Sequence, residues 1–323
     1  MRWKELKGAL LSRGGARLTG LPADEFIARS AAGPGAGGAG SVFFTRDGRR
    51  VRLPFDPEGN IEVIHRGGGD AVIVLDGSEY TGKLEPVALH CPRQAYITVS
   101  GSCIFHCRYC PVPGQAGRRK TIEEIVAMVA AVSEQIDAIA ITSGVMTDTT
   151  EEEAYVIAVV RALLPIGIPI GVSIYPTPFT PRRLYDLGVA EVKFNIETAT
   201  PDLFADFCPG LDWKLIWRVL EESVELFGRG HVFSNVIAGL SETDAEMESC
   251  IRSLTAIGVI PVLRPLNPAG GLKDYRRPTK ERLMRLADMH YQLLKEADLI
   301  PAQAVSMCSA CTGCDLVPGR DFA

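Results

Sequence analysis

From about residue 95 onward, short apolar runs alternate with amphipathic, capped segments, and this alternation limits the possible fold more than any other feature. Ala95–Val99 is the first run of strand type. Thr121-Ile-Glu-Glu124 has the spacing of a capping box, so a helix is expected to begin there. Strands that alternate with helices are typical of a parallel sheet with crossover helices. We therefore predict a full or partial α/β barrel of the triosephosphate-isomerase (TIM) type, with about six or seven β/α units. A doubly wound open sheet is the alternative.

Hydrophobic spacing locates the other elements of this body. Further strands are predicted at residues 138–142, 168–174, 191–195, 231–237 and 259–263, with a short last strand at 302–307. Helices are predicted from Thr121 to about Gln135, from a second capping box at 150–153, around 215–220 and 247–254, and over 279–297. In a barrel, functional side chains gather at the C-terminal ends of the strands.

The first 88 residues have a different pattern. Residues 31–40 form a Gly/Ala/Pro run, which is typical of a flexible linker. Two β-like stretches flank Asp47-Gly48, a dipeptide that accepts the positive φ of a hairpin turn, and another strand candidate at 71–75 ends in Asp76-Gly77. We predict a small, partly β N-terminal extension over residues 1–88 and the main domain over residues 89–323.

Six of the nine cysteines fall in two tight groups, Cys103-x3-Cys107-x2-Cys110 and Cys308-x2-Cys311-x2-Cys314. Thiols at such short spacing can converge on one metal centre. The first group has no fourth cysteine nearby. Structural zinc normally takes four closed ligands, whereas three thiolates leave one iron of a [4Fe–4S] cluster open. An open iron implies a ligand that takes part in chemistry.

With Tyr109 directly before its third cysteine, the stretch 103–110 resembles the signature of the radical S-adenosylmethionine (SAM) enzymes. The resemblance implies that the three cysteines hold a catalytic [4Fe–4S] cluster whose open iron binds SAM. One electron then cleaves SAM to methionine and a 5′-deoxyadenosyl radical. Tyr109 is expected to lie against the adenine.

The same resemblance implies SAM contacts at the ends of the predicted strands. Ser143 and Gly144 occupy the place of the superfamily's Gly-Gly-Glu element, although the amino-acid sequence here differs from that motif. Asn195 and Glu197 resemble the Asn-Leu-Asp/Glu-Thr segment of biotin and lipoyl synthases. A carboxylate suits the two vicinal ribose hydroxyls because it accepts two hydrogen bonds. Helix capping is the alternative for these last two residues.

Three residues at the ends of the fifth and sixth predicted strands complete the candidate SAM site: Ser234, Asn235 and Arg264. Arg264 could pair with a carboxylate of SAM or of the substrate. A structural ion pair is the alternative reading of this arginine.

The C-terminal thiols resemble part of a ferredoxin run without its final Cys-Pro. Zinc, with a fourth ligand from elsewhere, is the alternative to an auxiliary iron–sulfur cluster. Because the first and last strands of a barrel are neighbours, both cysteine groups are expected on the same face, looking into one cavity. Cys208 and Cys250 are expected to be small core or surface residues, and Cys91, just ahead of the first strand, stays unassigned.

The body of the chain is similar to the biotin synthase and lipoyl synthase branch, through residues 142–144, 195–198, 239–243 and the closing thiols. This implies sulfur insertion in lipoyl or biotin-like cofactor biosynthesis, in the manner of the archaeal two-protein lipoyl synthases. The cysteine pattern of other lipoyl synthases is not shared. Implied partners are ferredoxin or flavodoxin, a lipoyl-carrier protein and a second radical SAM subunit.

Two alternatives to sulfur insertion stay open. One is a radical SAM enzyme of another cofactor pathway that rearranges or methylates its substrate, with the auxiliary cluster for electron transfer or substrate binding. The other is a non-catalytic iron–sulfur carrier. The formal charge of -5 and the pI near 5.7 argue against nucleic acid as a partner. No apolar run is long enough for a membrane span, and an odd number of clustered cysteines fits a reducing compartment, so a cytoplasmic protein is expected.

Overall fold

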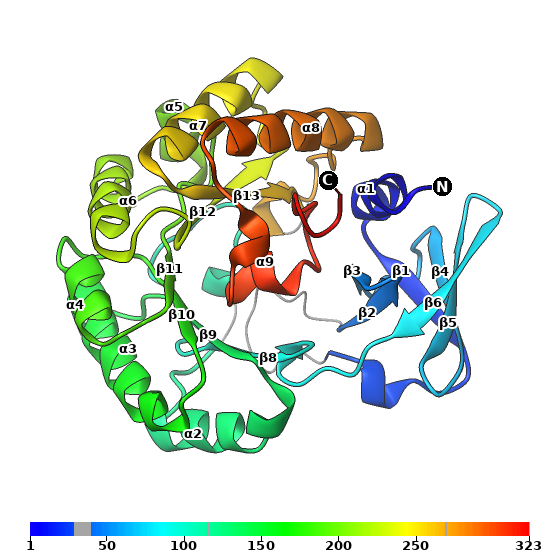
Figure 1. The fold of residues 1–323 in the computed structure, drawn as a ribbon, viewed down its shortest axis with the longest axis horizontal. Coiled ribbons are helices and arrows are strands. Elements are labelled where there is room, and N and C mark those ends of the chain that lie inside the picture. Colours follow the sequence, from blue (N-terminus) through cyan, green and yellow to red (C-terminus); the bar gives the residue numbers. More distant parts are fainter. Residues whose placement is uncertain (29–39, 115–116, 269, 323) are drawn as a thin grey trace.

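Parallel strands with helices on their outer face form the larger part of the molecule in the computed structural model, which describes residues 1–28, 40–114, 117–268 and 270–322 (Figure 1). The strands, each hydrogen-bonded in parallel to the next, are β8 (Gln94–Thr98), β9 (Ala138–Thr142), β10 (Ile170–Ser173), β11 (Glu191–Lys193), β12 (Val232–Ala238) and β13 (Ile260–Pro265). A short antiparallel strand, β7 (His90–Cys91), is added at the edge next to β8. The strand order runs in one direction from β8 to β13, which confirms a partial barrel of the TIM type over the doubly wound alternative.

The helices that cover this sheet are α2 (Ile122–Ala130), α3 (Thr149–Leu163), α4 (Thr180–Asp186), α5 (Pro201–Phe207), α6 (Trp213–Phe227), α7 (Asp244–Ile257) and α8 (Lys280–Glu296). The capping box of Thr121 and Glu124 is present, but α2 ends at Ala130, short of the predicted end. The second predicted capping box is wrong. Asp148 caps α3 instead, because its carboxylate accepts the N–H groups of Thr150 and Glu151.

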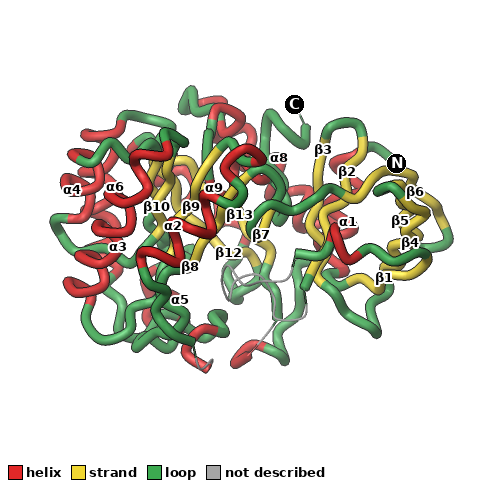
Figure 2. The backbone as a smooth tube through the Cα atoms, turned by 90° about the horizontal axis from the view of Figure 1, so that it is seen from below, coloured by secondary structure: helices red, strands yellow, loops and turns green. Residues whose placement is uncertain are grey.

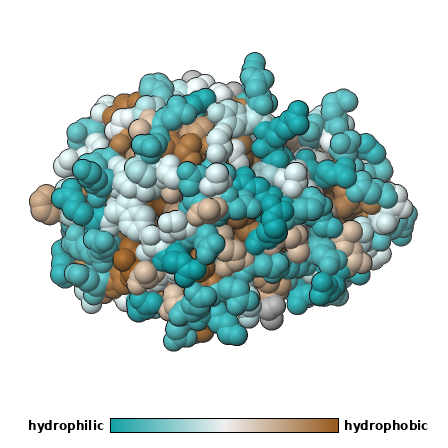
Figure 3. Space-filling model, turned by 90° about the horizontal axis from the view of Figure 1, so that it is seen from above, coloured by the Kyte–Doolittle hydropathy of each residue, from teal (hydrophilic) through white to brown (hydrophobic). Residues whose placement is uncertain are grey.

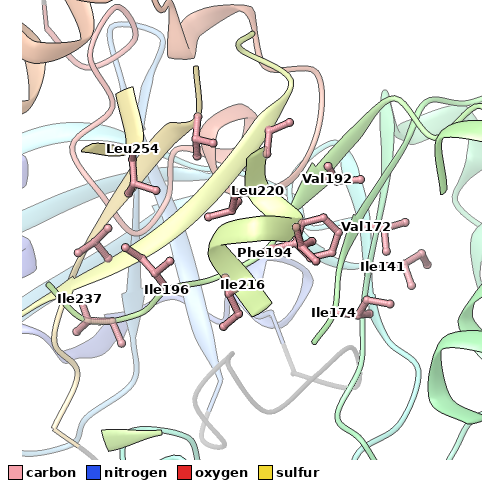
Figure 4. Close-up of a cluster of buried hydrophobic side chains, with 14 of the residues drawn as sticks. Ile141, Val172, Ile174, Val192, Phe194, Ile196, Ile216, Leu220, Ile237 and Leu254 are labelled. Atoms are coloured by element: carbon pink, nitrogen blue, oxygen red, sulfur yellow. The ribbon is translucent and has the colours of Figure 1, made fainter. Parts of the chain in front are cut away.

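The main core lies between the sheet and the helices, and Figure 4 shows part of it. Ile141 and Val172 of the sheet and Phe194 just after β11 pack with Ile216 and Leu220 of α6, and all five side chains are buried. Burial of such side chains stabilises the fold by roughly 1.5–3 kcal/mol each. Because side chains alternate along a strand, the residues between them point into the barrel.

Residues before β7 form a second sheet beside the barrel (Figures 1 and 2). Its order is β1-β4-β5-β6-β2-β3, and the elements of this part are α1 (Trp3–Arg13), β1 (Ala16–Gly20), β2 (Ser41–Arg46), β3 (Arg49–Pro54), β4 (Ile61–Gly67), β5 (Asp70–Leu75) and β6 (Ser78–Leu84). The predicted hairpin is confirmed, with φ of 52° at Asp47 and 73° at Gly48. The predicted linker lies outside the described residues except for Gly40.

This N-terminal part shares a hydrophobic core with the end of the chain. Leu283 and Ala287 of α8 and Leu316 of the C-terminal segment are buried together with Leu6 and Leu10 of α1. In both views the C-terminus lies close to the junction of the two sheets (Figures 1 and 2). The N-terminal residues are therefore packed against the barrel and are not a detached extension.

The predicted last strand at 302–307 is wrong. A 3₁₀ turn (Pro301–Gln303) is followed by α9 (Met307–Cys311). The carboxylate of Glu191 accepts the backbone N–H groups of Val305 and Ser306 at 2.8 and 2.9 Å. These N–H groups would otherwise pair with a neighbouring strand, so the segment packs against the sheet without joining it.

The face shown in Figure 3 is mostly hydrophilic, with apolar side chains scattered over it. Within the described ranges, no helix is long and apolar enough to cross a membrane.

Candidate active site

A cavity of about 330 Å³ lies inside the partial barrel, and thiols of both cysteine groups line it. Cys103, Cys107 and Cys110 belong to the loop after β8, and Cys308, Cys311 and Cys314 belong to α9 and the turn after it. The prediction that both groups look into one cavity is therefore confirmed.

The first cysteine loop is held at the C-terminal ends of the strands. Ile104 N–H donates to Val145 O at 2.7 Å, and Val145 N–H lies 3.4 Å from Cys103 Sγ. A Cβ at Gly144 would lie only 2.2 Å from Ser102 O, so this position requires glycine. The Ser143-Gly144 turn thus supports the cysteine loop directly.

Ser143 lines the cavity, but its hydroxyl already has two partners. It accepts from Ser100 N–H at 3.0 Å and donates to the buried Glu152 carboxylate at 2.6 Å. Glu152 is held in turn by Arg119, whose Nη2 lies 2.8 Å from its carboxylate. This network fixes the start of the cysteine loop.

Glu197 and Tyr109 lie side by side in the cavity wall. Burial raises the pKa of Glu197 to about 7, although Lys193 opposes the rise and a hydrogen bond from Tyr109 lowers it. Burial also raises the pKa of Tyr109, with Glu197 as the next cause. Glu197 has φ of 57°, and the N-cap of α5 is Thr200. The helix-capping alternative for Glu197 is therefore wrong.

Asn195 and Asn235 also line the cavity, Asn195 from just after β11 and Asn235 from the middle of the neighbouring β12, not from its end. Asn195 Oδ1 accepts the Asn235 N–H at 3.1 Å, so Asn195 does not cap a helix. Asn235 Oδ1 is buried and has no hydrogen-bond partner among the described residues. A buried acceptor of this kind is suited to a donor on a ligand.

Ser234 points away from the other candidates. Its side chain is fully buried, and its hydroxyl accepts the Ile196 N–H at 2.9 Å. It therefore joins β12 to the segment after β11. The SAM contacts assigned to Ser234, as to the other candidates, stay predictions.

The C-terminal cysteines enter the barrel from the end opposite to the first group. Gln94, the first residue of β8, donates to Met307 O at 3.1 Å, and Glu191, the first residue of β11, holds Ser306. A Cβ at Gly171 would lie 2.1 Å from Ser306 Oγ. The expectation that both groups sit on the same face is wrong, and the cavity extends between them.

Two cations from the barrel contact the C-terminal group. Lys193 Nζ and Arg264 Nη1 each lie 3.3 Å from Cys308 Sγ. Burial works against the charge of Lys193, but the Cys308 thiol raises its pKa overall. Lys193 is only 3% exposed and was missed from the sequence, although a lysine inside an apolar strand was a usable signal. Arg264 thus contacts a thiol of the C-terminal group, and its pairing with a carboxylate of SAM or of the substrate stays a prediction.

The N-terminal part holds the C-terminal cysteines from the other side. Arg50 Nη1 donates to Cys311 O at 3.0 Å, and the Arg52 N–H donates to Gly313 O at 2.7 Å. Lys7 of α1 donates to Thr312 O. Residues 1–88, whose role was not readable from the sequence, therefore form one wall of the C-terminal cysteine site.

Within the part of the chain that the structure describes, no three His, Cys, Asp or Glu side chains are gathered closely enough to hold a single metal ion. Thiols of both cysteine groups line the cavity.

The raised pKa of Glu197 predicts a pH-dependent stability. The unfolded carboxyl titrates near pH 4.5 and the folded one near pH 7, so stability is lost as the pH rises through this interval. We expect the cluster-free Glu197→Gln protein to match the wild type at pH 4.5 and to exceed it by about 3 kcal/mol at pH 8. Denaturant unfolding at both pH values measures this, and an equal difference at both would contradict it.

Comparison with known families gives one match. Residues 97–254 match the Radical SAM superfamily. No curated protein matches the chain.

Two solved structures are similar in fold. The FeFe-hydrogenase maturase HydG from Carboxydothermus hydrogenoformans matches 62% of this chain with a TM-score of 0.53 and 18% identity. SuiB from Streptococcus suis, solved bound to S-adenosylmethionine, matches 64% with a TM-score of 0.54 and 11% identity. This chain covers 51% of the first protein and 48% of the second.

Proposed function

We propose that this chain, whose residues 97–254 match the Radical SAM superfamily, is a radical SAM enzyme that inserts sulfur during the biosynthesis of a lipoyl or biotin-like cofactor. One observation carries the proposal: both cysteine groups open onto a single cavity. A substrate carbon activated near the first group would be close to sulfur held by the second.

The residues of the first group fit a SAM-binding [4Fe–4S] cluster. Three thiols on one loop face the cavity, and three thiolates leave one iron for SAM. When bound, the cluster and SAM supply a 5′-deoxyadenosyl radical that removes a hydrogen atom from an unactivated C–H bond. Asn235 Oδ1 offers an acceptor to SAM, and Glu197 offers two carboxylate oxygens to the ribose hydroxyls.

The C-terminal group fits a second iron–sulfur cluster, which we propose as the sulfur-donating substrate. The carbon radical forms a C–S bond with a cluster sulfide, and the electron left over reduces cluster iron. Lys193 and Arg264 beside Cys308 favour the negative charge of bound thiolates.

We propose ferredoxin or flavodoxin as the electron donor, an octanoylated lipoyl-carrier domain as the substrate and a second radical SAM subunit as a partner. A cavity of about 330 Å³ is at the small end for ligand pockets.

The cations at Cys308 also favour a second candidate. Net charge and hydrogen bonds to sulfur set the reduction potential of a cluster, and two cations tend to raise it. The second cluster would then relay electrons in a rearrangement or a methylation. In sulfur insertion two SAM are cleaved per product and the second cluster is consumed, whereas a relay cluster stays intact.

The test is anaerobic reconstitution with iron and sulfide, followed by measurement of iron and of 5′-deoxyadenosine released under reduction. We expect about eight irons in the wild type and about four in Cys308→Ala/Cys311→Ala/Cys314→Ala, since each [4Fe–4S] cluster holds four. The variant should still form 5′-deoxyadenosine but no sulfur-containing product. If the triple variant kept its iron and lost zinc instead, the proposed second cluster would be contradicted. If the wild type did not cleave SAM, the proposed radical SAM activity would be contradicted.

A further inference from the structure

Cys91 lies in the wall of the C-terminal cysteine site. It is 1% exposed and packs in a small cluster with Phe43, Cys311 and Tyr96. It lines the same cavity as Cys308 and the other C-terminal thiols. A cysteine more than two hundred positions earlier in the sequence is thus brought beside Cys311 by the fold.

Two connections, each through one intermediate residue, fix this cysteine relative to the C-terminal group. Cys91 pairs with Gln94 in the β7–β8 hairpin, and the Gln94 side chain donates to Met307 O at 3.1 Å, next to Cys308. On the other side, a Cβ at Gly313 would lie 2.8 Å from the Phe43 ring, against which Cys91 packs. The β7–β8 hairpin and the C-terminal turn therefore keep Cys91 close to the C-terminal thiols.

The surroundings suit a buried cluster of thiolates. The Arg50 guanidinium donates to Cys311 O, and Lys193 and Arg264 contact Cys308 Sγ. The Cys91 and Cys311 thiols lie within hydrogen-bond reach of each other. A metal that binds the thiol deprotonates it, and the nearby cations offset the resulting charge.

We propose that Cys91 is the fourth thiolate of the second iron–sulfur cluster, closing a four-cysteine site with Cys308, Cys311 and Cys314. The inference rests on the proposed function, because it takes a cluster at the C-terminal group as given. A site closed by four thiolates has no open iron, so the substrate meets cluster sulfide and not cluster iron.

Two other side chains compete for the fourth position. His90 Nδ1 and Asp315 Oδ1 are both buried without a hydrogen-bond partner among the described residues, and both residues line the cavity. Iron–sulfur clusters are held mainly by thiolates, which favours the cysteine over an imidazole or a carboxylate.

The experiment uses the full-length chain in a Cys103→Ala/Cys107→Ala/Cys110→Ala background. In this background the iron content and the electron paramagnetic resonance spectrum come from the second cluster alone. Cys91→Ala, His90→Asn and Asp315→Asn are added singly, and Asn is chosen at position 90 because His90 has φ of 76°. Cys250→Ala is the matched control, since Cys250 is also buried but lies on α7. Thermal unfolding of each cluster-free protein checks that it folds.

We expect about four irons per chain in the background protein, and a loss of about one iron or more in Cys91→Ala only. Cys91→Ala should also change the resonance spectrum, because one iron loses its thiolate. Four irons and an unchanged spectrum in Cys91→Ala would overturn the proposal, as would iron loss in His90→Asn or Asp315→Asn instead. A background protein without iron would overturn the second cluster itself, which separates the failure of the proposed function from the failure of this ligand.

Discussion

Replacing Cys107 with Ala is expected to abolish reductive cleavage of SAM and to remove about four irons per chain. The physical reason is that three thiolates on one loop hold the predicted catalytic cluster, and two are too few to retain it. Cys103→Ala and Cys110→Ala should have the same effect. Iron content and 5′-deoxyadenosine, measured after anaerobic reconstitution and reduction, test this prediction.

Cys208 provides the matched control. Its thiol lies 3.8 Å from Tyr109 Oη, and its hydrogen bonding is the largest cause of the lowered pKa of Cys107. It is buried next to the loop but is not part of the C-x3-C-x2-C group. Cys208→Ala should therefore keep its iron and still cleave SAM. Iron loss in Cys208→Ala, with full iron in Cys107→Ala, would show that the ligands are assigned wrongly.

The barrel was predictable because its signals are local. The apolar run at Ala95–Val99 and the capping box of Thr121 and Glu124 each depend on residues a few positions apart. The C-x3-C-x2-C loop lies at the C-terminal end of β8, where a barrel concentrates its chemistry. Local patterns were thus sufficient for the six parallel strands and for most of the covering helices, but the short helices α4 and α5 were not predicted.

The position of the C-terminal cysteines was not predictable in this way. Residues 302–307 look like a strand locally, but Glu191, more than a hundred positions away, takes the backbone N–H groups of Val305 and Ser306. The walls formed by Arg50 and Cys91 depend on equally distant contacts. Such contacts follow from packing, which a sequence pattern does not contain.

Lys7 is predicted to be the N-terminal residue on which the C-terminal site depends most. Its Nζ lies 2.7 Å from Asp321 Oδ2, and the two side chains are 0% and 1% exposed. Asp321 also accepts from Trp3 Nε1 at 2.9 Å, and Lys7 donates to Thr312 O, between two of the predicted cluster ligands. One buried ion pair therefore joins α1 to the C-terminal turn.

Lys7→Met should destabilise the cluster-free protein by about 3–5 kcal/mol, because it leaves the Asp321 carboxylate buried without a cation. Unfolding in urea measures this as a lower midpoint with an unchanged slope. Lys4→Met is the control, since its partner Asp288 is 66% exposed and such pairs contribute at most about 1 kcal/mol. Lys7→Met/Asp321→Asn should recover part of the loss, as the remaining polar group is neutral. Equal effects of Lys7→Met and Lys4→Met would mean that the pair does not hold the C-terminal turn to α1.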